Sequence, residues 1–205
     1  MAAPPLQLRF VMSAARSDQL PESPAEIAIA GRSNVGKSSL INALANRRQL
    51  AEVSKTPGRT RLLNLFELDP GGRGSADRPK PTVVDLPGYG YANVPANVKA
   101  TWGPMIEHYL LEREELQMIL VLVDGEVGPT KLDTAMLEWV DHHGLPYRVI
   151  ATKHDKVKPS ARDKRRRDLA AKCGLEQPDV LWVSAAKGVN IDTLRARIHA
   201  WLTPG

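Results

Sequence analysis

The chain has 205 residues, a net charge of +5, and 42% hydrophobic and 25% charged residues, which fits one large soluble domain better than two. The longest apolar run, residues 118–123, is far shorter than the ~20 residues of a membrane-spanning helix. The N-terminus also lacks the basic and apolar regions of a secretory signal. Cys173 is the only cysteine, so no internal disulfide can form, and we expect a cytoplasmic protein without a membrane segment.

Apolar runs rich in Ile, Val and Leu alternate with segments of helical periodicity along most of the chain. This alternation predicts a three-layer α/β fold, in which a six-stranded, mostly parallel sheet carries helices on both faces. The expected strands are residues 26–30, 62–68, 81–85, 116–124, 146–152 and 179–184. The expected helices are residues 38–46, 95–113, 130–143, 159–173 and 190–202.

The linker between the second and third expected strands, residues 70–78, is rich in turn residues and has no helical pattern. A parallel return would need a longer crossover, so we expect an antiparallel hairpin and one antiparallel edge strand. Residues 1–24 contain four prolines and weak periodicity. We expect them to form a partly ordered extension in front of a single domain, residues 25–205, and the sequence leaves open whether residues 6–12 join the sheet.

A phosphate-binding loop is predicted between the first strand and the first helix. The stretch GRSNVGKS matches G-x-x-x-x-G-K-[ST] in the strand-to-helix context that makes this pattern specific. Its glycines let main-chain N–H groups and the positive end of the helix dipole approach phosphate, and a bare glycine turn is the weaker reading. Lys37 would reach the β- and γ-phosphates, and the Ser38 hydroxyl would ligate Mg²⁺. The predicted contacts are Gly31, Arg32, Ser33, Asn34, Val35, Gly36, Lys37, Ser38 and Ser39.

An Asp-x-x-Gly motif, Asp85-Leu86-Pro87-Gly88, follows the expected strand 81–85. A carboxylate at a strand end beside the phosphate loop can hold Mg²⁺ directly or through water. The glycine can bring its main-chain N–H to the γ-phosphate because it carries no side chain. We therefore expect Asp85 to be a metal ligand and Gly88 to be a catalytic contact, with Leu86 and Pro87 completing the segment.

A candidate switch loop, residues 54–61, is polar, contains glycine and precedes the expected strand 62–68. Such a loop can order when a threonine hydroxyl completes the Mg²⁺ shell and relax when the γ-phosphate leaves. We favour Thr60 as the metal-binding and catalytic residue, with Thr56 as the alternative. The predicted contacts in this loop are Gly58, Arg59, Thr60, Arg61 and Leu62.

Two short motifs after later strands indicate guanine as the base. Guanine presents two adjacent donors, N1–H and the 2-amino group, which one ionised carboxylate can accept, whereas adenine would leave that carboxylate unpaired. Asp155 in TKHD can play this part, and the Ala185 N–H after the last strand can bind O6. Because ligands of parallel sheets bind at the carboxyl ends of strands, the order of all four motifs favours GTP. The predicted contacts are Thr152, Lys153, His154, Asp155, Ser184, Ala185 and Ala186.

The stretches GRSNVGKSSLINAL, TPGRTR, DLPGYGYA, TKHDK and SAAKG together resemble the EngB/YihA/YsxC family of bacterial ribosome-assembly GTPases, within the translation-factor-related class. The resemblance runs from about Phe10 to the C-terminus. It implies a single P-loop GTPase domain, Mg²⁺-dependent binding of GTP and GDP, and a role in assembling the large ribosomal subunit. Loss of such proteins is associated with defects in growth, division and septation.

One position departs from the wider GTPase pattern. Many members of the class carry glutamine after the Asp-x-x-Gly glycine, where it orients the attacking water, but this chain has Tyr89, and the resembled family similarly lacks the glutamine. We therefore expect slow intrinsic hydrolysis, at most ~10⁻⁴ to 10⁻² s⁻¹. Asn34 is a candidate K⁺ ligand, as in related potassium-dependent GTPases, and the alternative is a loop residue that bonds its own backbone.

The positive charge is concentrated in residues 153–172, which contain nine Lys or Arg against three Asp. Such a patch suits a polyanion, since phosphate contacts give affinity with little sequence information. Charge alone does not distinguish this from a solvated helix face, and the family resemblance favours ribosomal RNA of the large subunit. We expect a monomer. The rival functions are a P-loop ATPase or kinase, which Asp155 disfavours, and a nucleotide-dependent RNA-binding module without hydrolysis.

Overall fold

A computed structural model describes residues 3–51, 62–68, 79–90 and 103–203. Its seven strands form one sheet in the order β1-β3-β4-β2-β5-β6-β7. Strands β2, β4, β5, β6 and β7 are parallel neighbours, whereas β3 runs antiparallel to both β1 and β4. The strands are β1 (Leu8–Ala14), β2 (Glu26–Gly31), β3 (Leu63–Leu68), β4 (Thr82–Asp85), β5 (Leu116–Asp124), β6 (Tyr147–Thr152) and β7 (Val180–Trp182).

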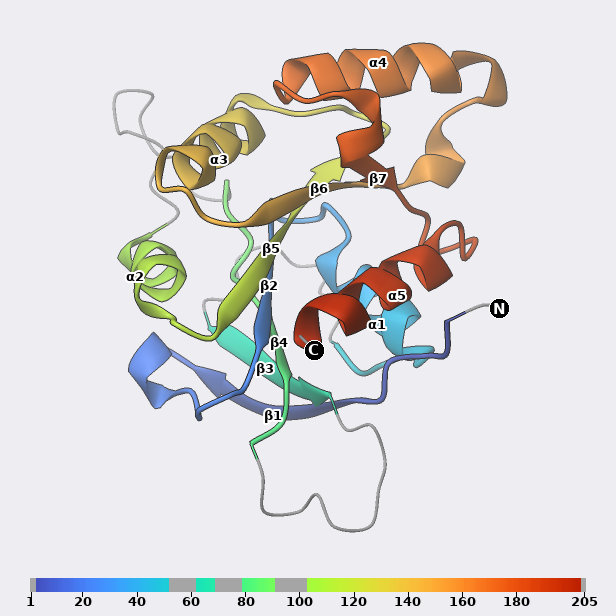
Figure 1. The fold of residues 1–205 in the computed structure, drawn as a ribbon. Helices are drawn as coiled ribbons and strands as arrows, with labels where there is room; N and C mark the ends of the chain where they lie inside the picture. The colour runs from blue at the N-terminus through green and yellow to red at the C-terminus, as the bar shows by residue number, and fades with distance from the viewer. Residues whose placement is uncertain (1–2, 52–61, 69–78, 91–102, 204–205) are drawn as a thin grey trace.

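Within these ranges, five α-helices cover the two faces of the sheet, and Figure 1 shows their arrangement. Helices α2, α3 and α4 contribute to one apolar cluster, and helices α1 and α5 contribute to the other. The strands between them are apolar on both faces, and all six residues of β2 are buried. The predicted three-layer α/β fold is confirmed. The helices are α1 (Lys37–Ala45), α2 (Pro104–Glu112), α3 (Lys131–His142), α4 (Arg162–Lys172) and α5 (Ile191–Leu202).

The predicted number of six strands is wrong, because β1 adds a seventh strand. This strand pairs with β3, so the antiparallel strand β3 lies inside the sheet rather than at its edge, while the predicted antiparallel pairing of 62–68 with 81–85 is confirmed. The register of β1 shifts between Phe10 and Met12. A bulge of this kind breaks the alternation of apolar residues that marks a strand in a sequence.

The predicted helix 95–113 is also wrong at its start. Helix α2 begins at Pro104, and Gly103 before it has a φ of 88°, which is not helical. Proline favours the first helical turn, and Pro104 supplies that signal at the start of α2. Residues 95–102 lie outside the described residues.

Candidate functional site

The phosphate-binding loop joins the carboxyl end of β2 to the start of α1. Gly36 has a φ of 111° and Asn34 a φ of 64°, so the loop turns through the left-handed region twice. A Cβ on Gly31 would lie 2.8 Å from Val35 Cγ1, which leaves room only for glycine. Gly36 occupies the N-cap of α1 without a side-chain cap. The first N–H groups of α1 therefore have no side-chain partner there and can bind an anion.

Lys37 and Asp85 bring opposite charges into the same buried space at this loop. Lys37 Nζ lies 3.5 Å from the Gly31 carbonyl oxygen. Burial lowers the pKa of Lys37, and the nearby Asp85 carboxylate opposes that shift. Burial raises the pKa of Asp85 to about 6, against the opposing effect of Lys37. Both shifts have the same cause, since burial penalises the charged form of each group.

The Asp85 carboxylate fits a divalent cation. Its Oδ1 is buried and has no hydrogen-bond partner among the described residues. An unsatisfied carboxylate oxygen beside a phosphate loop matches the preference of Mg²⁺ for hard oxygen ligands. Ser38, in the first turn of α1, is half-buried at the same edge. The other predicted ligand, Thr60, lies outside the described residues, as do Thr56, Gly58, Arg59 and Arg61, and Leu62 is exposed just before β3.

The Asp-x-x-Gly segment lies directly on the phosphate-binding loop. The Ser33 N–H donates to the Tyr89 carbonyl at 3.1 Å, and the Ser33 hydroxyl donates to the Gly88 carbonyl at 3.4 Å. A Cβ on Gly88 would lie 2.9 to 3.0 Å from three atoms of Ser33, so a larger residue would collide with the loop. Leu86 is buried in the apolar cluster formed with α2, α3 and α4. The structure thus brings the two motifs together, as their order predicts.

The Tyr89 side chain, which follows Gly88, is buried against α3. Its hydroxyl donates to Asp133 Oδ1 at 3.3 Å. Burial and the Asp133 carboxylate raise the pKa of Tyr89 well above its usual value. Sequence reasoning missed Asp133. It is detectable only as the partner of Thr130 in a capping box at the start of α3.

The predicted base-binding segments meet at the ends of β6 and β7. The Ser184 hydroxyl donates to Asp155 Oδ1 at 2.5 Å, and this bond is the main reason that the pKa of Asp155 lies below its usual value. Asp155 is therefore an ionised acceptor at neutral pH. Ser184 is fully buried and also accepts the Lys187 N–H at 3.1 Å. Ala185 is half-buried and Ala186 is exposed in the same turn.

Thr152 and Lys153 tie the base-binding segment to the phosphate loop and to β5. The Thr152 hydroxyl donates to the Val35 carbonyl at 2.7 Å. Lys153 has a φ of 57°, and its Nζ lies 2.6 Å from Asp124 Oδ2. Asp124 in turn accepts the N–H groups of Glu126 and Val127. Asp124 is a second residue that sequence reasoning missed, because its partner is distant in the chain.

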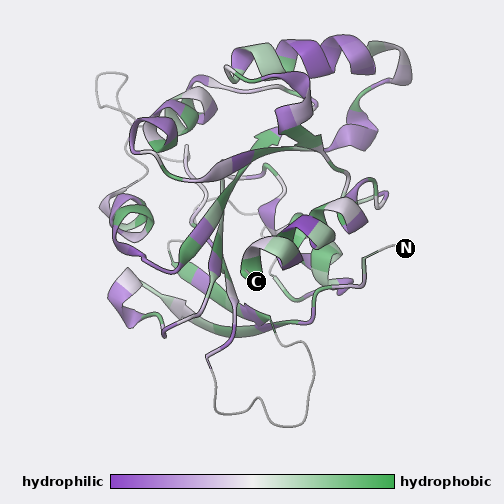
Figure 2. Cartoon of the chain, viewed as in Figure 1, coloured by the Kyte–Doolittle hydropathy of each residue, from purple (hydrophilic) through white to green (hydrophobic). Residues whose placement is uncertain are grey.

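His154 contacts α4 rather than an open surface. Its residue is 7% exposed, its Nε2 lies 3.4 Å from Arg166 Nη2, and its ring packs edge-on to Trp182 at 5.9 Å. Burial, Arg162 and Arg166 lower the pKa of His154, with Asp155 opposing. The basic helix α4 therefore contacts the base-binding segment through Arg166 and His154. Figure 2 shows α4 as a largely hydrophilic helix.

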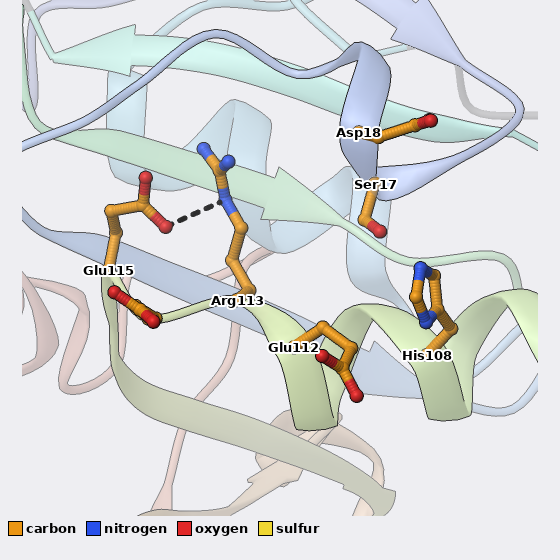
Figure 3. Close-up of a pocket in the computed structure, with 7 residues that line it drawn as sticks. Ser17, Asp18, His108, Glu112, Arg113 and Glu115 are labelled. Carbon is orange, nitrogen blue, oxygen red and sulfur yellow. Dashed lines mark ion pairs between the residues drawn. The ribbon is translucent and has the colours of Figure 1, made fainter.

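A pocket of about 320 Å³ lies away from this site, and Figure 3 shows its lining. Arg113 Nε lies 3.4 Å from Glu115 Oε2 within it, and Glu115 immediately precedes β5. The pocket is therefore near the amino ends of the parallel strands, opposite the predicted motifs. Its carboxylates repel a phosphate chain. Its lining residues are Ser17, Asp18, His108, Glu112, Arg113, Glu114 and Glu115.

Comparison with known proteins assigns the chain to a family. The family described as "50S ribosome-binding GTPase" matches residues 26–153. A probable GTP-binding protein EngB of Geobacter sulfurreducens is 42% identical over 96% of this chain and 91% of its own length. A second, from Desulfosudis oleivorans, is 40% identical over 89% of each chain.

The chain belongs to the EngB family of GTP-binding proteins. A crystal structure of a probable EngB protein matches this fold with a TM-score of 0.66 at 26% identity, covering 87% of this chain and 98% of its own. Aquifex aeolicus Era bound to GDP·AlF₄⁻ matches with the same TM-score at 25% identity, covering 90% of this chain and 58% of its own. This EngB-family chain is therefore a GTP-binding protein with the P-loop GTPase fold.

The membership fits the placement of the motifs described above. As a member of a GTPase family, this EngB-type protein is a GTPase. In the described ranges, no helix is long and apolar enough to cross a bilayer. The same ranges hold no cluster of three or more His, Cys, Asp or Glu side chains that could bind a metal on their own. A metal held by Asp85 and Ser38 would depend on phosphate oxygens to complete its shell.

Proposed function

We propose that this EngB-type GTPase is a cytoplasmic, monomeric switch with slow intrinsic hydrolysis, that it acts in assembly of the large ribosomal subunit, and that cells need it for normal division and septation. The observation that carries this proposal is the arrangement of Lys37, Gly88 and Asp155 along one sheet edge. Lys37 and Gly88 lie at the phosphate loop, and Asp155 lies at the ends of β6 and β7, which supports a triphosphate site at the loop and a base site beside it.

The phosphate end of the site would act through charge and position. The N–H groups of the loop 31–36 and the first turn of α1 would cradle the phosphates, and Lys37 would neutralise charge that develops on the γ-phosphate. Ser38, Thr60 and Asp85 would hold Mg²⁺, and the buried, unsatisfied Oδ1 of Asp85 supports that role. The Gly88 N–H would contact the γ-phosphate. Water would then attack the γ-phosphate, with GDP as the leaving group.

The base end would select guanine through Asp155. The low pKa of Asp155 supports an ionised carboxylate that accepts N1–H and the 2-amino group together. Ser184 would hold that carboxylate in place, and Ala185 would donate its main-chain N–H to O6. An adenine base would leave the same carboxylate unpaired, which supports GTP over ATP.

Slow hydrolysis is supported by the placement of Tyr89. Its hydroxyl donates to Asp133 in the first turn of α3 and its side chain is buried, so the phenol oxygen already has a protein partner. No carboxamide at that position is available to orient water. We propose that a ribosomal partner accelerates the step, and Asn34, which is exposed in the loop, is a candidate ligand for an assisting K⁺. Equal rates of GTP hydrolysis in K⁺ and Na⁺ buffers would contradict a role for Asn34 as a K⁺ ligand.

The basic segment 153–172 is the proposed contact to ribosomal RNA. Its charges divide into two groups in the structure. Four are half-buried and in contact with other residues: Lys153 pairs with Asp124, and Arg162, Arg165 and Arg166 contact Val157, Val127 and His154 respectively. The cations that are free to meet a polyanion are exposed, namely Lys156, Lys158, Lys164, Arg167 and Lys172.

The test is cosedimentation with large ribosomal subunits in GDP, in a non-hydrolysable GTP analogue, and without nucleotide. Binding should depend on nucleotide and fall steeply as salt rises. Lys164→Glu combined with Arg167→Glu should remove binding while GTP affinity stays unchanged. A matched control, Arg47→Glu combined with Arg48→Glu, reverses two exposed cations just after α1, away from α4. Equal binding by wild type and the α4 variant would contradict the proposed RNA contact.

A turnover assay separates the two rival functions. GTP hydrolysis should increase when large subunits are added, and excess ATP should not compete with labelled GTP. Absence of turnover under both conditions would favour a non-hydrolysing RNA-binding module. Strong competition by ATP would favour a P-loop ATPase.

A further inference from the structure

The Asp133 carboxylate is a shared acceptor for the two phosphate-side motifs. It is fully buried at the start of α3. Its Oδ2 accepts the Arg32 Nε–H at 2.9 Å, and its Oδ1 accepts the Tyr89 hydroxyl at 3.3 Å. Arg32 belongs to the phosphate loop and Tyr89 follows Gly88. One side chain therefore links the loop to the Asp-x-x-Gly segment.

The anchor itself is held rigidly. The Thr130 N–H and hydroxyl both donate to Asp133 Oδ2, at 2.8 and 2.9 Å. The bond from the Thr130 N–H is one half of a capping box, whose other half is the Asp133 N–H donating to the Thr130 side chain, and the box fixes the carboxylate at the start of α3. A buried carboxylate with four hydrogen-bond donors has little freedom to reorient.

The segment after Gly88 is confined on the same helix. Arg32 and Tyr89 face each other as parallel bridge partners, which extends the pairing of β2 with β4. Gly90 has a φ of 83°, and a Cβ there would lie 2.7 Å from Leu132 Cδ1. Tyr89 is thus fixed at both its main chain and its hydroxyl, and Gly88 is attached directly to it.

We propose that Asp133 is a positioning residue for the γ-phosphate, because it anchors Tyr89 and so holds the Gly88 N–H at a fixed distance from the phosphate loop. The inference depends on the assignment of Gly88 to the γ-phosphate under the proposed function. Tyr89 therefore serves as an anchor where other GTPases carry a catalytic glutamine. Since only GTP has a γ-phosphate, loss of the anchor affects GTP and leaves GDP unaffected.

The test compares nucleotide affinities of Asp133→Asn and Tyr89→Phe with wild type in Mg²⁺ buffer. The probes are GDP and a non-hydrolysable GTP analogue. If Gly88 must be ordered at binding, analogue affinity in Tyr89→Phe falls about five- to thirtyfold, the size expected for fixing one residue, and its GDP affinity stays the same. Asp133→Asn also removes an acceptor of Arg32 in the phosphate loop, so the GDP comparison is made with Tyr89→Phe. Tyr89→Phe keeps the ring packed, so it tests the anchor even if Asp133→Asn folds poorly. The double variant should lose no more than the larger single loss.

The matched control is Thr134→Val, which removes a hydroxyl on the same helix that donates only to the Thr130 and Lys131 carbonyls and leaves Asp133 and its partners in place. It should change neither affinity. Equal loss of GDP and analogue affinity in Tyr89→Phe would indicate a purely structural role and overturn the inference. Unchanged analogue affinity in both anchor variants would also overturn it.

Hydrogen–deuterium exchange of residues 85–90 distinguishes this inference from the proposed function. In wild type, the analogue should protect this segment more than GDP does. In Tyr89→Phe, this difference between the two nucleotides should be smaller. Equal protection by the two nucleotides in wild type would show that Gly88 does not contact the γ-phosphate, which overturns both. If the analogue protects the segment more than GDP does in wild type, and Tyr89→Phe shows the same difference in full, the anchor alone is overturned.

Discussion

Ser184 donates its hydroxyl to Asp155 across a 2.5 Å contact, although the two residues come from different strand ends. The hydroxyl is fully buried, and its own oxygen accepts the Lys187 N–H. This donor chain orients Asp155 and keeps it ionised. Base selection in this protein therefore depends on a residue that does not itself have to touch the base.

The first prediction concerns Ser184→Ala. Removing the hydroxyl takes a charge-assisted hydrogen bond from Asp155, so affinity for GDP should fall roughly 10- to 100-fold, as expected for a loss of about 1.5–3 kcal/mol. Titration calorimetry measures this loss. Ser13→Ala is the matched control, since its hydroxyl donates to Asn64 Oδ1 across β1 and β3, away from the nucleotide motifs, and its effect on GDP affinity should be small. Equal effects of the two substitutions would contradict the role of Ser184.

The second prediction concerns the identity of the base. Asp155→Asn replaces one acceptor with a donor, so guanine meets an N–H group where its 2-amino group needs an oxygen. Xanthine carries an oxygen at that position, and the same amide can donate to it. Affinity should shift from GDP to XDP, measured by competition against a labelled nucleotide. If the variant still prefers GDP over XDP, Asp155 does not read the base.

The third prediction concerns Asp85 in the protein without nucleotide or metal. Burial raises the pKa of Asp85 to about 6, from an ordinary value of 3.8. Between about pH 4 and pH 6, Asp85 is therefore mostly protonated in the folded protein and mostly ionised in the unfolded chain. The ionised carboxylate therefore destabilises the fold above pH 6, and stability declines as pH rises from about 4 to 6. Asp85→Asn should raise the free energy of unfolding at pH 7.5, by at most about 3 kcal/mol.

Urea denaturation in EDTA at pH 5 and pH 7.5 measures that difference, and the gain should be smaller at pH 5. The same variant should lose the Mg²⁺ dependence of nucleotide binding. Gln117→Asn provides a control at an exposed site on β5. A variant less stable than wild type at pH 7.5 would show that the carboxylate is favourable where it lies.

The fourth prediction concerns His154. Burial and the cations Arg162 and Arg166 hold the pKa of His154 below its usual value of about 6.5, while Asp155 opposes them. The unfolded chain thus binds the proton more readily, so stability should be lost as pH falls below about 6.5. His154→Gln should lose less of its thermal stability between pH 7.5 and 5.5 than wild type. His199→Gln serves as the control.

Much of the phosphate side could be predicted from the sequence because its chemistry is local. The loop 31–38 places all its groups within one turn and one helix start, and the fixed pattern carries the geometry with it. The strands near the centre of the sheet were also predictable, since β2 and β5 are almost continuously apolar. Their carboxyl ends then locate the motifs at one edge.

The parts that could not be predicted depend on contacts between distant segments. Asp133 receives Tyr89 from 44 positions away and Arg32 from 101 positions away, and nothing in the local sequence encodes either contact. The pair of Lys153 with Asp124 is of the same kind. Strand β1 was obscured by its bulge, because a register shift removes the alternating pattern.

The last prediction concerns Glu26, a buried carboxylate at the amino end of β2, far from the nucleotide motifs. It accepts hydrogen bonds from the Thr82 hydroxyl at 2.7 Å, the Tyr109 hydroxyl at 2.7 Å and Arg113 Nε at 3.0 Å. The bonds from Tyr109 and Arg113 attach the carboxyl end of α2 to the amino end of β2. Glu26→Ala would leave Arg113 without its buried partner, which costs about 3–5 kcal/mol in similar cases.

Chemical denaturation should therefore show a large loss for Glu26→Ala and a smaller loss, about 1–2 kcal/mol, for Tyr109→Phe, which removes one hydroxyl and keeps the ring. Glu67→Ala is the matched control, since its partner Arg9 is largely exposed and such pairs contribute little. The ratio of GTP-analogue to GDP affinity should stay unchanged in all three, because the network lies at the opposite end of the strands. A change in that ratio for Tyr109→Phe would mean that α2 transmits the nucleotide state to the amino end of the sheet.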